Sequence, residues 1–141
     1  MIIGCQNRHT IGVRIVTAAV IEEDGKILIA KRRAGDRFGR LWEFPGGKLE
    51  SGESPEQCLE RELREELGID VRVSGFLGSY PFSSPALSLE LQVFRACIIG
   101  GRPCPREHEE VRWVSPGDLK SFSFTEPDRA LVVKLVKNFE D

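Results

Sequence analysis

GGKLESGESPEQCLERELREELGI, residues 46–69, decides the fold of this chain of 141 residues. Its first half follows Pro45 and contains Gly46, Gly47 and Gly52. Glycine permits positive φ angles and lets a ligand approach the backbone closely. We therefore expect the first half to be an irregular loop and the second half to be a helix.

Both ends of the expected helix are marked in the sequence. Ser54 suits the N-cap, Pro55 suits the first helical position, and Gln57 completes a Ser-x-x-Gln capping box. Gly68 stands where a left-handed C-cap belongs. These signals predict a helix over Pro55–Leu67.

The expected helix has two neighbouring stripes. Leucines at every fourth position make an apolar stripe, Leu59, Leu63 and Leu67. Three glutamates share the adjacent face because they lie three or four positions apart, namely Glu62, Glu65 and Glu66. Carboxylates this close repel one another, and the C-terminal half of a helix disfavours anions. Considered alone, these residues fit either a solvated acidic face or a site for a hard cation.

The spacing of the whole stretch resembles the signature of the Nudix hydrolases. Gly47 is followed after five residues by Glu53, and after seven more by the run Arg61-Glu62-Leu63-x-Glu65-Glu66-x-Gly68-Ile69. Every fixed position of that signature is matched. The resemblance implies an α/β fold, the α/β/α sandwich with a mixed β-sheet between helices, and a single domain over residues 1–141. It also implies metal-dependent hydrolysis of a diphosphate linked to another moiety.

The resemblance assigns roles to the acidic residues. Mg²⁺ is the expected cofactor, and Mn²⁺ is expected to substitute for it. The implied metal ligands are Glu62, Glu65, Glu66, Glu107 and Gly46. The implied catalytic residues are Glu53, Glu65, Glu66 and Glu107. The identity of the general base stays open between Glu53 and Glu107, with Glu109 and Glu110 as competitors. The alternative for the segment around Glu107 is a plain acidic loop. His108 is expected at the surface.

Further residues are expected to bind substrate or to support the site. Arginine offers fork-like donors that suit phosphates. The candidates for substrate binding are Arg32, Arg33, Phe44, Lys48 and Asp128. Solvated side chains remain the alternative for the cations, and a core position is favoured for Phe44. The supporting residues are Gly47, Arg61 and Gly68.

The layout resembles the MutT-like nucleoside triphosphate pyrophosphohydrolases. The similar segments are LWEFPGGK at residues 41–48 and PDRALVVKL at residues 127–135. In that branch a residue at the start of the last helix binds the base, and Asp128 falls there. An N-cap role for Asp128 is also open, and Ala130 replaces a proline often found in the branch.

The implied reaction gives the monophosphate and pyrophosphate, by attack of water at the β-phosphorus. A (d)NTP is the expected substrate, normal or modified, for example 8-oxo-dGTP or a (d)CTP. The alternatives are ADP-ribose, a dinucleoside polyphosphate, or a non-catalytic nucleotide sensor.

Composition limits the partners. The formal net charge is −2, which gives no bulk electrostatic attraction to nucleic acid or to a membrane. We therefore expect a small-molecule nucleotide as the partner, no nucleic acid and no membrane, with monomer or homodimer left open. Four cysteines without metal-site spacing and a start without a signal-peptide pattern favour a cytoplasmic protein with reduced thiols.

The remaining segments alternate between strand and turn patterns. An Asp-Gly turn at residues 24–25 predicts a hairpin between the first two strands. The expected strands are Val13–Ile21, Ile27–Ala30, Leu41–Phe44, Val71–Leu77, Ser88–Ile99 and Val111–Val114. Gly78–Leu87 is rich in serine and proline and is predicted to be a loop. A closing helix is predicted over Asp128–Phe139, and Met1–Gly12 fits either a frayed start or an edge strand.

Overall fold

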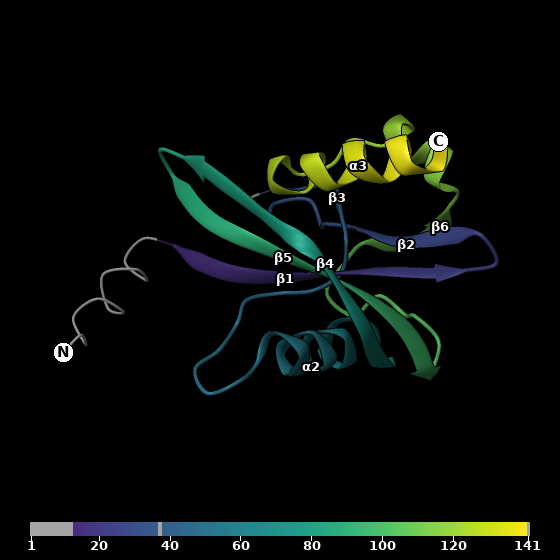
Figure 1. Ribbon diagram of the computed structural model, residues 1–141, viewed down its shortest axis with the longest axis horizontal. Helices are drawn as coiled ribbons and strands as arrows, with labels where there is room; N and C mark the ends of the chain where they lie inside the picture. The colour runs from purple at the N-terminus through teal and green to yellow at the C-terminus, as the bar shows by residue number, and fades with distance from the viewer. Residues whose placement is uncertain (1–12, 37, 141) are drawn as a thin grey trace.

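A mixed sheet lies between two helices in the computed structural model, which describes residues 13–36 and 38–140. Figure 1 shows helix α2 on one side of the sheet and helix α3 on the other. The elements are β1 Arg14–Glu23, β2 Lys26–Lys31, β3 Trp42–Glu43, α2 Pro55–Leu67, β4 Asp70–Ser84, β5 Leu87–Gly100, β6 Glu110–Val114, the 3-10 helices η1 Pro116–Ser121 and η2 Glu126–Asp128, and α3 Arg129–Glu140. The predicted sandwich is confirmed, and the expectation for Met1–Gly12 lies outside the described residues.

The order of strands explains why the sheet is mixed. The strands lie in the order β3-β2-β1-β5-β4, and β6 pairs with β2. β1 and β5 are parallel, whereas the other pairs are antiparallel. The predicted hairpin joins β1 and β2, and its turn residues Asp24 and Gly25 both have positive φ, at 52° and 78°.

Helix α2 begins and ends where the capping signals predicted. The Ser54 hydroxyl accepts a hydrogen bond from the Gln57 backbone N–H at 3.1 Å, and the Gln57 side chain accepts one from the Ser54 N–H at 2.9 Å. Gly68 closes the helix with a φ of 70°. The orphan groups at both ends of α2 therefore find local partners.

Strand β1 divides the core into two layers. Alternate residues of a strand face opposite sides of the sheet. Ala18 and Val20 pack in the layer beneath α3, whereas Ala19 and Ile21 pack with the buried leucines of α2. The apolar stripe of α2 is fully buried, at Leu59, Leu63 and Leu67. This burial fixes the rotation of α2 and hence the direction of its glutamates.

The predicted loop Gly78–Leu87 is wrong, because β4 continues through Ser84. Serine, glycine and proline are weak local strand formers, but pairing with β5 along almost its whole length overrides this preference. β4 is an edge strand, so the proline at position 81 needs no partner for a ladder hydrogen bond on its free side. Shifts in the β4–β5 register accommodate the glycines near the middle of β4.

The glycine-rich loop fills a gap in the sheet. β1 and β2 pair only beside their turn, and the rest of that edge of β1 bonds to the loop. The backbone bonds run from Ala19 N–H to the Pro45 oxygen at 2.8 Å, from Thr17 N–H to the Gly47 oxygen at 2.8 Å, and from Leu49 N–H to the Ile15 oxygen at 3.0 Å. The loop therefore lies at the middle of the sheet, directly before α2.

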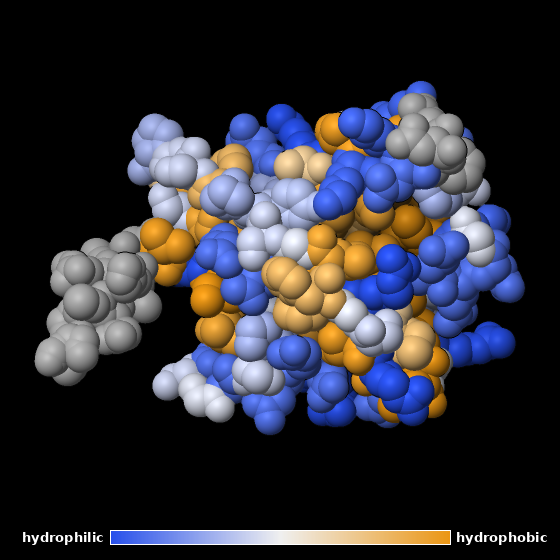
Figure 2. All heavy atoms as spheres, in the orientation of Figure 1, coloured by the Kyte–Doolittle hydropathy of each residue, from blue (hydrophilic) through white to orange (hydrophobic). Residues whose placement is uncertain are grey.

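Charged and polar side chains cover most of the face shown in Figure 2, with apolar side chains between them. The large apolar residues that stay exposed are Val13, Phe76, Ile99 and Val133. Within residues 13–36 and 38–140, every helix is too short or too polar to cross a membrane.

Candidate active site

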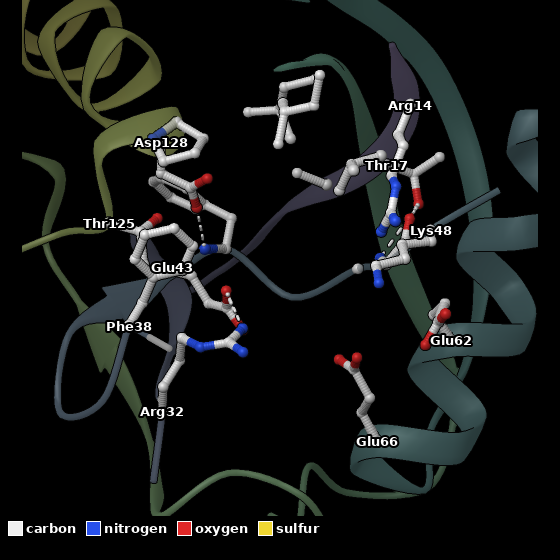
Figure 3. Close-up of a pocket in the computed structure, with 18 of the residues that line it drawn as sticks. Arg14, Thr17, Arg32, Phe38, Glu43, Lys48, Glu62, Glu66, Thr125 and Asp128 are labelled. Carbon is white, nitrogen blue, oxygen red and sulfur yellow. Dashed lines mark hydrogen bonds and ion pairs between the residues drawn. The ribbon is translucent and has the colours of Figure 1, made fainter. Parts of the chain in front are cut away.

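A cavity of about 600 Å³ opens between α2, the glycine-rich loop and the start of η2. Figure 3 shows carboxylates projecting into it from α2, with basic and aromatic groups on the other walls. The predicted site residues that line it are Arg32, Phe44, Gly46, Gly47, Lys48, Glu62, Glu66, Glu107 and Asp128. One cavity therefore collects residues that lie up to 96 positions apart in the sequence.

Glu62 and Glu66 form the acidic wall. Both side chains point from α2 toward the same space (Figure 3). Burial, together with the charges of Glu43, Glu62 and Glu107, raises the pKa of Glu66 to about 9. Burial also raises the pKa of Glu62. The two carboxylates are thus held together at a cost in free energy, because burial and mutual repulsion both disfavour their ionised forms.

The glycines of the loop pack directly against the Glu62 carboxylate and against strand β1. A Cβ atom on Gly47 would overlap the Glu62 carboxylate, and one on Gly46 would overlap the Thr17 carbonyl oxygen. Thr17 is buried, and its hydroxyl donates to the Gly47 oxygen at 3.1 Å. The loop is thereby held against β1, with its backbone facing the cavity.

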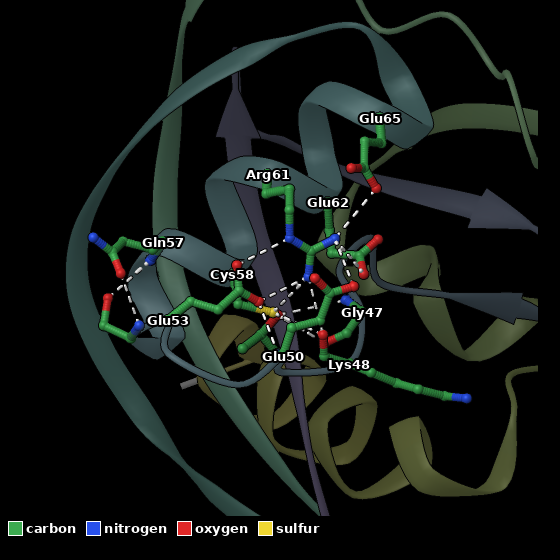
Figure 4. Close-up of polar contacts among 11 residues, drawn as sticks. Gly47, Lys48, Glu50, Glu53, Gln57, Cys58, Arg61, Glu62 and Glu65 are labelled. Atoms are coloured by element: carbon green, nitrogen blue, oxygen red, sulfur yellow. Dashed lines mark hydrogen bonds and ion pairs between the residues drawn. The ribbon is translucent and has the colours of Figure 1, made fainter.

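Arg61 binds the loop to the helix. Its guanidinium donates to both oxygens of Glu53, at 2.8 and 2.9 Å, and to the Lys48 carbonyl at 3.1 Å. The same group contacts Glu62 and Glu65 at 3.3 and 3.2 Å, as Figure 4 shows. Arg61 therefore joins the loop to the helix beside the acidic wall, and its role in supporting the site stays a prediction.

Glu53 is a weak proton acceptor in this arrangement. Its hydrogen bonds from Arg61 and from the Glu50 backbone N–H lower the pKa of Glu53 to about 2. Glu53 does not appear among the described residues that line the cavity. Of the two candidates for the general base, Glu107 is the one that reaches the cavity, and its charge contributes to the raised pKa of Glu66.

Two other predicted residues lie away from the described lining of the cavity. The side chain of Glu65 is 54% exposed and bonds to Arg61. Arg33 donates to the backbone carbonyl of Arg106 at 3.0 Å. Their expected roles as metal ligand and phosphate ligand stay predictions, and their observed contacts are structural.

His108 is buried, so the expectation that it lies at the surface is wrong. It is 6% exposed and its Nε2 atom lies 2.7 Å from Glu43 Oε2. The other oxygen of Glu43 accepts a hydrogen bond from Arg32 at 3.0 Å, and Arg32 also binds Asp36. The polar pattern of residues 107–110 suggested a solvated segment, but this chain of contacts draws His108 into the cavity wall.

The wall of the cavity around Asp128 is where the base of a nucleotide was expected. Asp128 is buried, and its carboxyl group accepts a hydrogen bond from the Phe44 backbone N–H at 2.8 Å. Phe44 is both core and cavity wall, since its ring stacks on Phe124 at 5.2 Å while it lines the cavity. Asp128 precedes α3 by one residue, and its hydrogen bond ties the start of that helix to the end of β3.

Replacing Asp128 with asparagine should weaken the dependence of stability on pH. Burial and the charge of Glu43 raise the pKa of Asp128 from 3.8 to about 8. A raised folded-state pKa gives stability that is fully present below the unfolded pKa and is lost as the pH rises through the folded value. The melting temperature of the wild type should therefore fall from pH 5 toward pH 8, in the window of this shift.

Differential scanning calorimetry across this pH range would measure the effect. The melting temperature of Asp128→Asn should fall less steeply as the pH rises. The part of the fall that is due to Glu66 should remain. An unchanged slope would mean that Asp128 is ionised in the folded protein.

Several lining residues escaped the sequence-based prediction. Three polar examples are Arg14, Thr17 and Glu43. Arg14 shares a face of β1 with Val16 and Ala18, so strand alternation alone carried a signal for it. Thr17 and Glu43 resembled ordinary strand residues, and only the packing of the glycine-rich loop and of His108 reveals their positions.

The acidic wall fits a divalent cation. Glu66 Oε1 is buried and has no hydrogen-bond partner within the described part of the chain. Carboxylate oxygens are the ligands that Mg²⁺ prefers, usually with water and substrate phosphates completing the shell. Among the described residues, no three acidic, histidine or cysteine side chains lie close enough together to hold a metal by themselves, so bound water and substrate phosphates would have to supply the remaining ligands.

Comparisons with known proteins agree with this geometry. The NUDIX domain matches residues 12–135. The CTP pyrophosphohydrolase of Escherichia coli K12 is 38% identical over 117 residues, which are 83% of this chain and 87% of that protein. The 8-oxo-dGTP diphosphatase of Haemophilus influenzae is 31% identical over 124 residues, 88% of this chain and 91% of that protein.

A solved structure shows the same fold. The crystal structure of a MutT NUDIX hydrolase from Burkholderia pseudomallei superimposes with a TM-score of 0.77 at 29% identity, covering 86% of this chain and 96% of that one. With a family match over most of its length and these relatives, the chain belongs to the Nudix hydrolases, in their MutT-like group.

Proposed function

We propose that this protein hydrolyses a (d)NTP, normal or carrying an oxidised or methylated base, to the monophosphate and pyrophosphate. The observation that carries the proposal is the single cavity in which the acidic wall of Glu62 and Glu66 faces a buried polar pocket at Asp128. One end suits a metal with phosphates and the other suits a flat base. The curated relatives named for CTP and for 8-oxo-dGTP support a nucleoside triphosphate and leave the base undecided.

Different residues of the cavity would bind the metal and the phosphates. Glu62, Glu66 and Glu107 would hold Mg²⁺, which when bound neutralises charge on the phosphate oxygens and favours ionisation of the attacking water. Lys48 and Arg14, on the same side of the cavity, attract the phosphate chain (Figure 3). Lysine and arginine supply positive charge and donors that match phosphate oxygens.

Proton transfer in this scheme belongs to Glu107. A general base needs access to the reacting water and a pKa that leaves it able to accept a proton. Glu53 meets neither requirement, since Arg61 holds it ionised with a pKa of about 2 and it lies outside the described lining. Glu107 lines the cavity and faces Glu66.

The base lies between apolar walls in this proposal. Leu89, Leu91 and Phe44 line the cavity, and the backbone N–H of Phe44 donates a hydrogen bond to Asp128. Asp128 presents a carboxyl group whose raised pKa, about 8, lets it carry a proton at neutral pH. A protonated carboxyl group both donates and accepts hydrogen bonds, so it matches a base edge that offers an acceptor beside an N–H group.

A substrate panel tests this function. Normal, 8-oxo and methylated (d)NTPs would be compared with ADP-ribose and dinucleoside polyphosphates under Mg²⁺ or Mn²⁺, with pyrophosphate and phosphate measured separately. We expect pyrophosphate from one (d)NTP to dominate, and Asp128→Ala to change the ranking of bases more than the metal requirement.

Other outcomes of the panel reject parts of the proposal. Activity confined to ADP-ribose or to a dinucleotide would retain the metal site and reject the base pocket. Tight nucleotide binding without any product would favour a sensor. Equal losses on every base in Asp128→Ala would reduce that residue to its structural bond with Phe44.

A further inference from the structure

The loop between β5 and β6 is anchored to the last turn of α2, and this anchor has no place in the chemistry described so far. The Cys104 N–H donates to the Leu67 carbonyl at 3.0 Å, and the Arg106 N–H donates to the Glu66 carbonyl at 3.0 Å. The carbonyls at a helix C-terminus lack partners within the helix. The loop thus supplies partners to the end of the helix that carries the acidic wall.

The side chain of Arg106 adds a second attachment. Its Nη1 atom donates to the Arg64 carbonyl at 3.2 Å. Its guanidinium lies over Gly68, where a Cβ atom would come within 2.8 Å of Nη2. A cation at this end of a helix is favoured by the helix dipole. The positive φ of Gly68 favours glycine, and a side chain there would also displace the Arg106 guanidinium from its place over the helix end.

The other side of the loop is bound to β2. The carbonyl of Arg106 accepts the hydrogen bond from Arg33, and the Glu109 N–H donates to the Lys31 carbonyl at 2.8 Å. Glu107 lies between these two attachments and lines the cavity. The residue before Glu107 is Arg106, whose backbone N–H is bonded to the Glu66 carbonyl. Glu107 therefore follows directly after a point at which the loop is attached to α2.

We propose that Arg106 is a positioning residue, which holds the Glu107 carboxylate in register with Glu62 and Glu66 and thereby completes the metal site. The proposal rests on the proposed function, because it takes Glu107 to act at the metal. Arg106 lies outside the described lining of the cavity, so it acts on the site by fixing the loop that carries Glu107 against the end of α2.

A double-mutant cycle on the intact protein tests this role. The variants are Arg106→Ala, Glu107→Gln and the double variant, with Arg102→Ala as a control that removes an exposed arginine from the same loop. The first readout is the dissociation constant for Mn²⁺ without nucleotide, followed by the electron paramagnetic resonance of free Mn²⁺. The second is kcat on the preferred substrate, and the third is the melting temperature.

We expect Arg106→Ala to weaken Mn²⁺ binding about tenfold, the lower end of the range for groups that orient a metal ligand from outside its shell. The double variant should bind Mn²⁺ no more weakly than Glu107→Gln alone, because the proposed effect of Arg106 on the metal depends on the position of the Glu107 carboxylate. Arg106→Lys, which keeps a donor for the Arg64 carbonyl, should recover part of the affinity.

Three results would overturn the proposal. Effects that multiply in the double variant would show that Arg106 acts independently of Glu107. A lower melting temperature with unchanged Mn²⁺ affinity would reduce Arg106 to a helix cap. Unchanged Mn²⁺ affinity in Glu107→Gln would show that Glu107 does not act at the metal, so Arg106 could not act through it. Since Mn²⁺ binding is measured without nucleotide, a wild type inactive on every (d)NTP would reject the proposed function and still leave this test decisive.

Discussion

Replacing Glu66 with glutamine should lower kcat by roughly 10³-fold while the fold persists. Glu66 is the most buried carboxylate of the acidic wall, and one of its oxygens has no partner within the described residues. Loss of a metal ligand removes several kcal/mol of transition-state stabilisation, and each 1.4 kcal/mol corresponds to a factor of about ten. The measurement is steady-state kinetics with varied Mg²⁺.

Without metal, the stability of Glu66→Gln should not fall as its kcat does. Burial and neighbouring carboxylates raise the pKa of Glu66 to about 9, so its contribution to stability is lost as the pH rises toward that value. The neutral amide in Glu66→Gln escapes this loss, and without metal its melting temperature at pH 8 should equal or exceed that of the wild type. In the wild type, apparent Mn²⁺ affinity should increase up to about pH 9, because protons and metal compete for Glu66.

Glu60→Gln provides the matched control, since it makes the same change on the same helix outside the described lining of the cavity. Near-wild-type turnover in Glu66→Gln would remove Glu66 from the metal site. A collapse of the melting temperature would instead assign Glu66 a structural role.

Replacing Gly47 with alanine should cost roughly 10²-fold in kcat/KM with little loss of stability. The new methyl group would overlap the Glu62 carboxylate, which is the free end of a flexible side chain and can move aside. A displacement of about 1 Å in a catalytic arrangement costs about 10²-fold. Kinetics and a Mn²⁺ titration would measure the loss, and calorimetry would show that the protein still folds.

Gly75→Ala is the control for this substitution, because a Cβ atom there meets nothing within 4 Å and the backbone needs no positive φ. Unchanged activity in Gly47→Ala would show that Glu62 can leave its position without consequence. The proposed metal ligands would then reduce to Glu66 and Glu107.

Local signals in the sequence are sufficient to determine helix α2 and its acidic face. Ser54, Gln57 and Gly68 act through contacts a few residues away, so their effect is encoded in adjacent sequence. The spacing of Glu62 and Glu66 follows from the helical repeat. The hairpin of β1 and β2 follows in the same way from the Asp-Gly turn.

Tertiary structure alone decided the features that depend on distant partners. The segment that continues β4 after Gly78 is a strand because β5 pairs with it, against its local preference. His108 is buried because its ring pairs with the carboxylate of Glu43, 65 positions earlier. Asp128 meets Phe44 across 84 positions. Such contacts form only when the sheet brings separate segments together, and periodicity within a short window carries no trace of them.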